Sequence, residues 1–348
     1  MSEEPAMVLR PVPHTSPSGA VGRRSLLLGT AAWCATAAGC TRGAGTPAAA
    51  GVRTPAEAAH ATAPATSGAL PAAVPWRPGP GEIEPAVKLA AVRLVEALGT
   101  WPAGRGGPRN ATARAAALGI SAPLAARFAA GAGPLTPAAD QAVVRVIDAQ
   151  YGGLLPDTAS VLIPCAQSTR TGSTVREGGT TVDVRLERTS AGWSVTALHP
   201  GRPGPAATPS AAARAVLAQP RIELPPGSAA DIRSGAVHES VLRAMLRLAD
   251  TYRVSVSVVR SGHPIDVFGT SRPSDHPLGR AFDVWAVDGR PVVDPATPRS
   301  LVTAFMRAAA AAGSYNVGGP VRLSGGTRPN QFFSDATHHD HVHIGFAA

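Results

Sequence analysis

The chain has 348 residues, of which 44% are hydrophobic and 16% charged, so it is long enough for about two domains and too apolar for a disordered polyelectrolyte. Its formal net charge of +9 comes from arginines scattered without a basic run and from a single lysine, Lys88, a pattern that argues against nucleic-acid binding. Three cysteines are too few for a disulfide framework, and no apolar run reaches the ~18 residues of a membrane-spanning helix.

The first 40 residues predict an export signal. Arg23-Arg24, a short apolar stretch and small residues before Cys40 are typical of a twin-arginine signal peptide. The ending Ala37-Ala38-Gly39-Cys40 resembles a bacterial lipobox, which implies that Cys40 is lipidated and anchors the protein to the membrane. An ordinary cleaved signal, which would release the protein, is the alternative. Both interpretations predict an extracytoplasmic protein, in which Cys165 is a small buried hydrophobe.

Two segments follow the signal. Residues 41–80 are rich in Ala, Pro, Thr and Gly and predict a disordered tether, because they cannot bury enough apolar surface to offset the entropy of ordering. Residues 81–200 predict a small α+β domain of unknown role. Its expected elements are a helix at 85–99, a helix after Pro137 that carries Val143, Val144 and Ile147, strands at 161–163 and 182–187, and a hairpin return at 193–197.

A Pro/Gly/Ala linker at 201–209 leads to a C-terminal domain at 210–348. Periodicity and turn residues predict its elements, which are helices at 210–217, 237–250 and 297–313 and strands at 254–258, 281–287 and 341–346. Asp288-Gly289 is typical of a hairpin turn. The expected fold class is α+β, with a C-terminal antiparallel sheet flanked by helices.

Histidines gather at the C-terminal end of this domain. Four of the chain's ten histidines lie in the run 338–343, which reads His-His-Asp-His-Val-His. Residues two apart on a strand share a face, so His341 and His343 point the same way. If that strand lies beside the strand at 281–287, both can converge with His276 and Asp283. Two imidazoles, one carboxylate and an open fourth position are typical of a catalytic zinc, which activates a water molecule and polarises a carbonyl.

A metal-activated water also needs a general base. No glutamate follows Glu239, so a helical His-Glu-x-x-His motif is absent from this part of the sequence and a carboxylate base must be an aspartate. Asp340 stands three residues before His343. Strict alternation would aim it away from the site, so the hypothesis places Asp340 in the turn before the strand.

Two motifs carry a family resemblance. Ser274-Asp-His276-Pro-Leu-Gly279-Arg-Ala281-Phe-Asp283 resembles the Ser-x-His-x-x-Gly-x-Ala-x-Asp signature of M15-type D-alanyl-D-alanine carboxypeptidases. His338-x-Asp340-x-x-His343 resembles the second half of that signature. His341-x-His343 is similar to the His-x-His of the wider lysostaphin-like and sonic-hedgehog-like zinc superfamily. The resemblance covers 210–348 and implies a hedgehog- and DD-peptidase-like fold.

The resemblance also implies roles for single residues. It implies a zinc ion, Zn2+, with three protein ligands, which are His276, Asp283 and His343. Asp340 would be the catalytic base, and His338 would stabilise the developing oxyanion. His341 would support the ligands or be an alternative ligand. The arginine that binds a substrate carboxylate is not fixed by the motif, and the candidates are Arg260 and Arg272.

The sequence therefore predicts an exported zinc-dependent peptidase that hydrolyses amide bonds in peptidoglycan stem peptides, as a D,D-carboxypeptidase or a related enzyme. One alternative is a non-catalytic zinc- or cell-wall-binding lipoprotein. Another is a scaffold lipoprotein whose 81–200 domain binds a protein partner. Asp340 and His338 favour the enzyme, since binding alone does not need a base.

Overall fold

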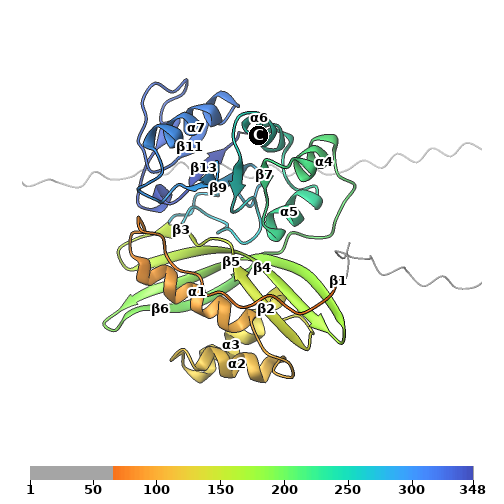
Figure 1. Cartoon of the computed structure of the whole chain (residues 1–348). Coiled ribbons are helices and arrows are strands. Elements are labelled where there is room, and N and C mark those ends of the chain that lie inside the picture. The colour runs from red at the N-terminus through yellow and green to blue at the C-terminus, as the bar shows by residue number, and fades with distance from the viewer. Residues whose placement is uncertain (1–65, 348) are drawn as a thin grey trace, which may run out of the picture. The chain divides into compact units, whose positions relative to one another are not determined.

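The computed structural model describes residues 66–347, so the predicted signal at 1–40, with Cys40, lies outside the described residues. The described residues belong to one compact unit with two hydrophobic cores and two sheets (Figure 1). Helices and mainly antiparallel strands are both present, which confirms the α+β class. Within 66–347, every helix is too short or too polar to cross a membrane.

The first half, residues 66–200, combines helices with a six-stranded antiparallel sheet. Its helices are α1 (Pro85–Gly99), α2 (Pro108–Ala116) and α3 (Ala122–Gly131), followed by the 3-10 turn η1 (Gly133–Leu135). Its strands are β1 (Thr66–Ser67), β2 (Gln141–Val146), β3 (Gln150–Leu154), β4 (Thr158–Thr171), β5 (Thr174–Thr189) and β6 (Gly192–Pro200). The long strands β4 and β5 pair with each other, β2 and β3 both pair with β4, and β1 and β6 both pair with β5.

Helix α1 packs against the sheet of the first half, and Figure 1 shows it running along the strands. It begins at Pro85, as predicted, because proline fits the first helical position, whose N–H has no partner within the helix. Leu94 and Leu98 are fully buried in the hydrophobic core of the first half, which we call the first core. Lys88 is fully buried as well, although it is charged. This helix therefore carries a charged group into the interior.

The predicted strands of the first half are confirmed, and one predicted helix is wrong. The β5–β6 hairpin turns at Thr189–Gly192 as expected. Cys165 is buried and free on β4, and burial raises the pKa of its thiol to about 11. The helix expected after Pro137 is the strand β2. Ala142, Val144 and Val146, which are two residues apart, are all buried, while Arg145 on the other face is exposed, an alternation typical of a strand with one buried face.

The tether prediction for 41–80 is wrong over the part that the structure describes, 66–80. The strand β1 pairs with the end of β5. The backbone N–H of Trp76 donates to Glu96 Oε1 at 2.8 Å, and the indole packs against the first core. The indole buries apolar surface, which offsets the entropy of ordering this Pro-rich segment. The rest of the predicted tether, 41–65, lies outside the described residues.

The second half, residues 210–347, contains four helices and a seven-stranded sheet within the described range. Its helices are α4 (Ala211–Ala218), α5 (Pro226–Arg233), α6 (Glu239–Ala249) and α7 (Arg299–Ala311), with the 3-10 turn η2 (Thr337–His339). Its strands are β7 (Ile222–Glu223), β8 (Val254–Val256), β9 (Ala281–Val287), β10 (Arg290–Pro291), β11 (Asn316–Gly318), β12 (Phe332–Phe333) and β13 (Val342–Gly345). The structure confirms the predicted helices α4, α6 and α7 and the predicted strands β8, β9 and β13. No end of these elements differs from its prediction by more than two residues.

The sheet of the second half runs in the order β12-β11-β13-β9-β8-β7, with β10 beside β9. The prediction of a wholly antiparallel sheet is wrong at its edges, because β7 pairs with β8 and β11 with β12 in parallel. The central pair β9–β13 is antiparallel, as the site hypothesis requires. The two strands that carry the histidine and aspartate motifs therefore lie side by side at the centre of this sheet.

Candidate metal centre

The β9–β13 pair brings the two sequence motifs together. In its register Asp283 on β9 lies directly opposite His343 on β13. His276 precedes β9 in a tight turn whose Gly279 has a φ of 71°. A side chain at Gly279 would also clash with the carbonyl oxygen of Ala236, so this position needs a glycine. The turn folds back toward β9 and places the imidazole of His276 beside Asp283.

Three potential ligand atoms form a small triangle. His276 Nε2 lies 3.1 Å from Asp283 Oδ1 and 3.2 Å from His343 Nδ1, and His343 Nδ1 lies 3.1 Å from Asp283 Oδ1. Ligand atoms about 2.0–2.1 Å from a tetrahedral zinc ion are separated by about 3.3 Å. The His276 Nδ1 group faces the carbonyl oxygen of Val259 at 2.8 Å, which directs the Nε2 lone pair at the triangle. The donor set and its spacing therefore fit zinc.

The pKa shifts of two triangle groups, Asp283 and His343, suit the binding of a cation. Burial alone would raise the pKa of Asp283, but His276 and His341 hold it well below its ordinary value. Burial lowers the pKa of His343 to about 4. At neutral pH Asp283 is therefore ionised and His343 neutral, as metal ligation requires.

His263 is a further candidate ligand that the sequence did not single out. Its ring stacks on the ring of His276, with the two ring centroids 4.1 Å apart and an angle of 13° between the ring planes. Ligand atoms of His263, His276 and Asp283 lie within 4.8 Å of one another. This group shares two members with the triangle. The set with His343 has the shorter separations, so we favour His343 as the third ligand and His263 as a packing neighbour.

The triangle lines a cavity of about 550 Å³ to which both halves of the chain contribute. His338 and His341 line it with the three triangle residues, and β3 of the first half adds Tyr151. Of the two predicted substrate arginines, Arg272 lines the cavity and Arg260 does not. Arg260 instead donates from Nη1 to the carbonyl oxygen of Pro203 at 3.4 Å. The prediction of Arg260 as a substrate ligand therefore does not fit the structure.

Asp340 lies in the turn before β13, as predicted, but its carboxylate does not line the cavity. Its Oδ1 accepts from His341 Nδ1 at 2.6 Å, and its Oδ2 accepts from the backbone N–H of Tyr151 at 3.0 Å. Oδ2 also pairs with Lys88 Nζ at 2.7 Å. Burial alone would raise the pKa of Asp340, but Lys88 and His341 hold it well below its usual range. Asp340 therefore fits poorly as a general base, because both of its oxygens are occupied away from the cavity.

Behind Asp340 lies a buried chain of charges that the sequence analysis did not find. Lys88 Nζ pairs with Glu82 as well as with Asp340, and the lysine side chain is 0% exposed. Burial raises the pKa of Glu82 to about 7. Burial alone would lower the pKa of Lys88, but Asp340 and Glu82 raise it. The only lysine of the sequence therefore joins α1 to the histidine motif as a cation.

Gln150 on β3 makes a second connection between the halves. Its Nε2 donates to Asp283 Oδ2 at 2.7 Å, and its Oε1 accepts from Ser257 Oγ. The hydrogen bond from Gln150 occupies Oδ2 of Asp283 and leaves the other oxygen, Oδ1, facing His276 and His343. The segment 81–200, which the sequence analysis treated as a separate domain, thus holds a candidate metal ligand in place.

His338 lines the cavity as well. Its Nδ1 contacts Asp335 Oδ1 at 2.7 Å, and its ring packs edge-on against Phe333. Burial alone would raise the pKa of Asp335, but hydrogen bonds and the charge of His338 lower it to about 2. Asp335 therefore orients His338 in the way that Asp340 orients His341.

Comparison of the chain with protein-family models, curated proteins and solved structures found no match. The class of this site therefore rests on its own geometry, a buried His-His-carboxylate triangle that lines a cavity beside a histidine oriented by an aspartate.

Proposed function

We propose that the protein is a zinc-dependent peptidase that hydrolyses amide bonds in peptidoglycan stem peptides, as a D,D-carboxypeptidase or a related hydrolase. The observation that carries the proposal is the triangle of ligand atoms of His276, Asp283 and His343, separated by 3.1–3.2 Å beside a cavity. The substrate class rests on the resemblance of the two motifs to M15-type peptidases. Export, with a lipid on Cys40 or after simple cleavage, rests on the sequence of the first 40 residues.

When bound, zinc would supply a Lewis acid that polarises the scissile carbonyl and lowers the pKa of a water molecule. His276, Asp283 and His343 would hold it. We assign the general base to His341, because its Nδ1 is engaged by Asp340 and its Nε2 lies 3.9 Å from Asp283 Oδ1, beside the triangle. Asp340 fixes the orientation of His341. Burial alone would lower the pKa of His341, but Asp283 and Asp340 raise it, which makes its Nε2 a stronger proton acceptor.

Two further side chains of the cavity have roles in this proposal. His338, held by Asp335 through Nδ1, would in its imidazolium form donate a hydrogen bond from Nε2 to the developing oxyanion. Arg272 would bind a terminal carboxylate of the substrate, since the guanidinium fork matches that group. These roles position the peptide on the open side of the triangle.

Replacing Gln150 by leucine is expected to weaken zinc binding by about 10–100-fold, because Asp283 loses the hydrogen bond that orients it. Competition with a chelating indicator dye measures this affinity. The control is Gln167→Leu, which removes another buried glutamine of the same sheet, bonded to the carbonyl oxygens of Gly99 and Leu135. That variant is expected to lose stability and to keep its affinity for zinc. Equal zinc affinity in the wild type and Gln150→Leu would contradict the orienting role.

Incubation of the full chain with purified peptidoglycan tests the proposed function. New amine termini are expected to appear, to disappear after treatment with a chelator and to return when zinc is added. Zinc binding without release of amines would overturn the proposed activity and favour the non-catalytic zinc- or wall-binding alternative. Release of amines that is insensitive to the chelator would overturn the role of the metal.

A further inference from the structure

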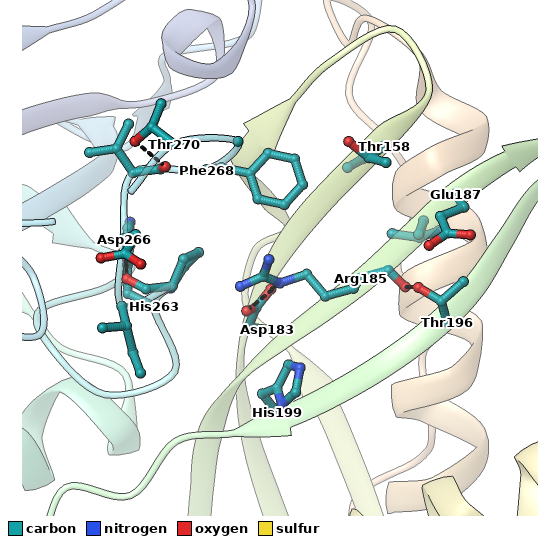
Figure 2. A pocket seen from close by; sticks show the side chains of 16 residues that line it. Thr158, Asp183, Arg185, Glu187, Thr196, His199, His263, Asp266, Phe268 and Thr270 are labelled. Carbon is teal, nitrogen blue, oxygen red and sulfur yellow. Dashed lines mark hydrogen bonds and ion pairs between the residues drawn. The ribbon is translucent and has the colours of Figure 1, made fainter. Parts of the chain in front are cut away.

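A second cavity, of about 640 Å³, lies on the other side of the segment that borders the candidate metal centre. It is lined by β4, β5 and β6 of the first half and by the segment 263–270 of the second (Figure 2). His263, Val267 and Phe268 line both cavities. The two cavities are therefore neighbours that share one wall.

Arg185 on β5 is held in a fixed orientation at this second cavity. Its Nε donates to Asp183 Oδ1 at 2.9 Å and to Asp183 Oδ2 at 2.7 Å. Asp183 is 2% exposed and also accepts from Ser160 Oγ at 2.7 Å. Residues 183 and 185 share a face of the strand, and Figure 2 shows both side chains directed toward the segment opposite.

Phe268 holds the guanidinium group from the other side. The central carbon of the Arg185 guanidinium lies 5.1 Å from the centre of the Phe268 ring. The ring itself packs directly on the backbone of β3, where a Cβ added at Gly153 would clash with it. The buried carboxylate of Asp183 and the packed ring of Phe268 thus restrict the orientation of the Arg185 guanidinium before any ligand binds.

The two terminal nitrogens of Arg185 are left for a ligand. Asp183 engages Nε alone, and among residues 66–347 no acceptor bonds either Nη. Hydroxyl groups of Thr158 and Thr196 also line the cavity. An oriented guanidinium with unused Nη groups matches a carboxylate, which accepts two parallel N–H bonds. The exposed Glu187 and Asp266 on the lining repel any anion, and they disfavour a multiply charged phosphate more than a singly charged carboxylate.

We propose that this second cavity is a substrate-binding site in which Arg185 receives a carboxylate of the peptide remote from the scissile bond. The proposal rests on the proposed function, because the shared wall of His263, Val267 and Phe268 would let one peptide reach both cavities. Arg185 would select substrates that carry this carboxylate and take no part in the cleavage itself.

The test measures binding of two probes by calorimetry to the full chain stripped of metal, so that neither probe is cleaved. One probe is a stem peptide ending in D-Ala-D-Ala whose D-Glu residue carries a free α-carboxylate. The other is the same peptide with that carboxylate amidated. The free acid is expected to bind about tenfold more tightly, the effect of one charge-assisted hydrogen-bonded pair.

Arg185→Gln is expected to bind both peptides equally, with the affinity of the amidated one. The matched control is Arg176→Gln, an exposed arginine of the same strand outside the cavity, which keeps the tenfold preference. If Arg185→Gln unfolds because Asp183 loses its partner, Arg185→Lys is the second variant. It keeps a cation beside Asp183 but lacks the two parallel N–H donors of the guanidinium group, so it is expected to lose most of the preference for the free acid.

The outcomes separate this proposal from the proposed function. Equal binding of the two peptides by the wild type, or a preference that survives in Arg185→Gln or Arg185→Lys, overturns the role of Arg185 and leaves the peptidase proposal standing. Binding of neither peptide overturns the substrate class and this proposal with it.

Discussion

Replacing Lys88 by methionine is expected to lower the free energy of unfolding by about 3–5 kcal/mol, because it leaves the carboxylates of Asp340 and Glu82 buried without their cation. Methionine keeps the length of the lysine side chain and fills most of its volume. The loss of stability therefore measures the removal of the charge and not the creation of a cavity. Urea unfolding followed by circular dichroism measures the effect.

The control for this variant is Arg188→Met, which removes an exposed cation paired with the exposed Glu84 and is expected to cost less than about 1 kcal/mol. The double variant Lys88→Met/Asp340→Asn is expected to be less destabilised than the sum of its single changes, because both act on one buried pair. A Lys88→Met protein within about 1 kcal/mol of the wild type would show that the buried pair contributes little to the fold.

Replacing His341 by alanine is expected to lower kcat for amide hydrolysis by about 10²–10⁴-fold while zinc stays bound, since the proposed base is removed and the three ligands are kept. Release of amine termini gives the rate, and metal analysis of the same sample gives the zinc content. Both readouts are needed, because loss of activity together with loss of zinc would make His341 a ligand and not a base.

His339→Ala is the matched control, because His339 is the neighbouring histidine and does not line the cavity. Its Nε2 accepts from the backbone N–H of Ile83 at 3.4 Å, so its replacement is expected to leave kcat within a few-fold of the wild type. An unchanged kcat in His341→Ala would contradict the assigned base and would return Asp340 or a residue of the substrate to consideration.

The candidate ligands could be identified from the sequence because their geometry is local. Asp283 and His343 lie on strands whose alternation and turn residues are clear in the sequence, and one antiparallel pairing places them opposite each other. His276 is linked to Asp283 by a short turn that depends on Gly279. Only the pairing of β9 with β13 had to be assumed, and the structure confirms it.

The residues that hold the ligands in place could not be identified in this way, because they come from the other half of the chain. Gln150 meets Asp283 across 133 positions of sequence, and no local pattern marks it. Lys88 did carry a signal, since it shares a helix face with Ala91 and Val95, where a charge requires a buried partner. The direction of the Asp340 carboxylate depends on that partner, so neither chain position nor the family resemblance could show that its oxygens point away from the cavity.

The central claim is that His276, Asp283 and His343 bind a divalent metal. Metal analysis of the purified full chain, wild type and single alanine variants, tests it most directly. The account predicts about one zinc ion per chain, lost in His276→Ala and in His343→Ala and retained in His263→Ala. A wild-type chain without zinc, or zinc that stays after His276 and His343 are each replaced, would contradict it.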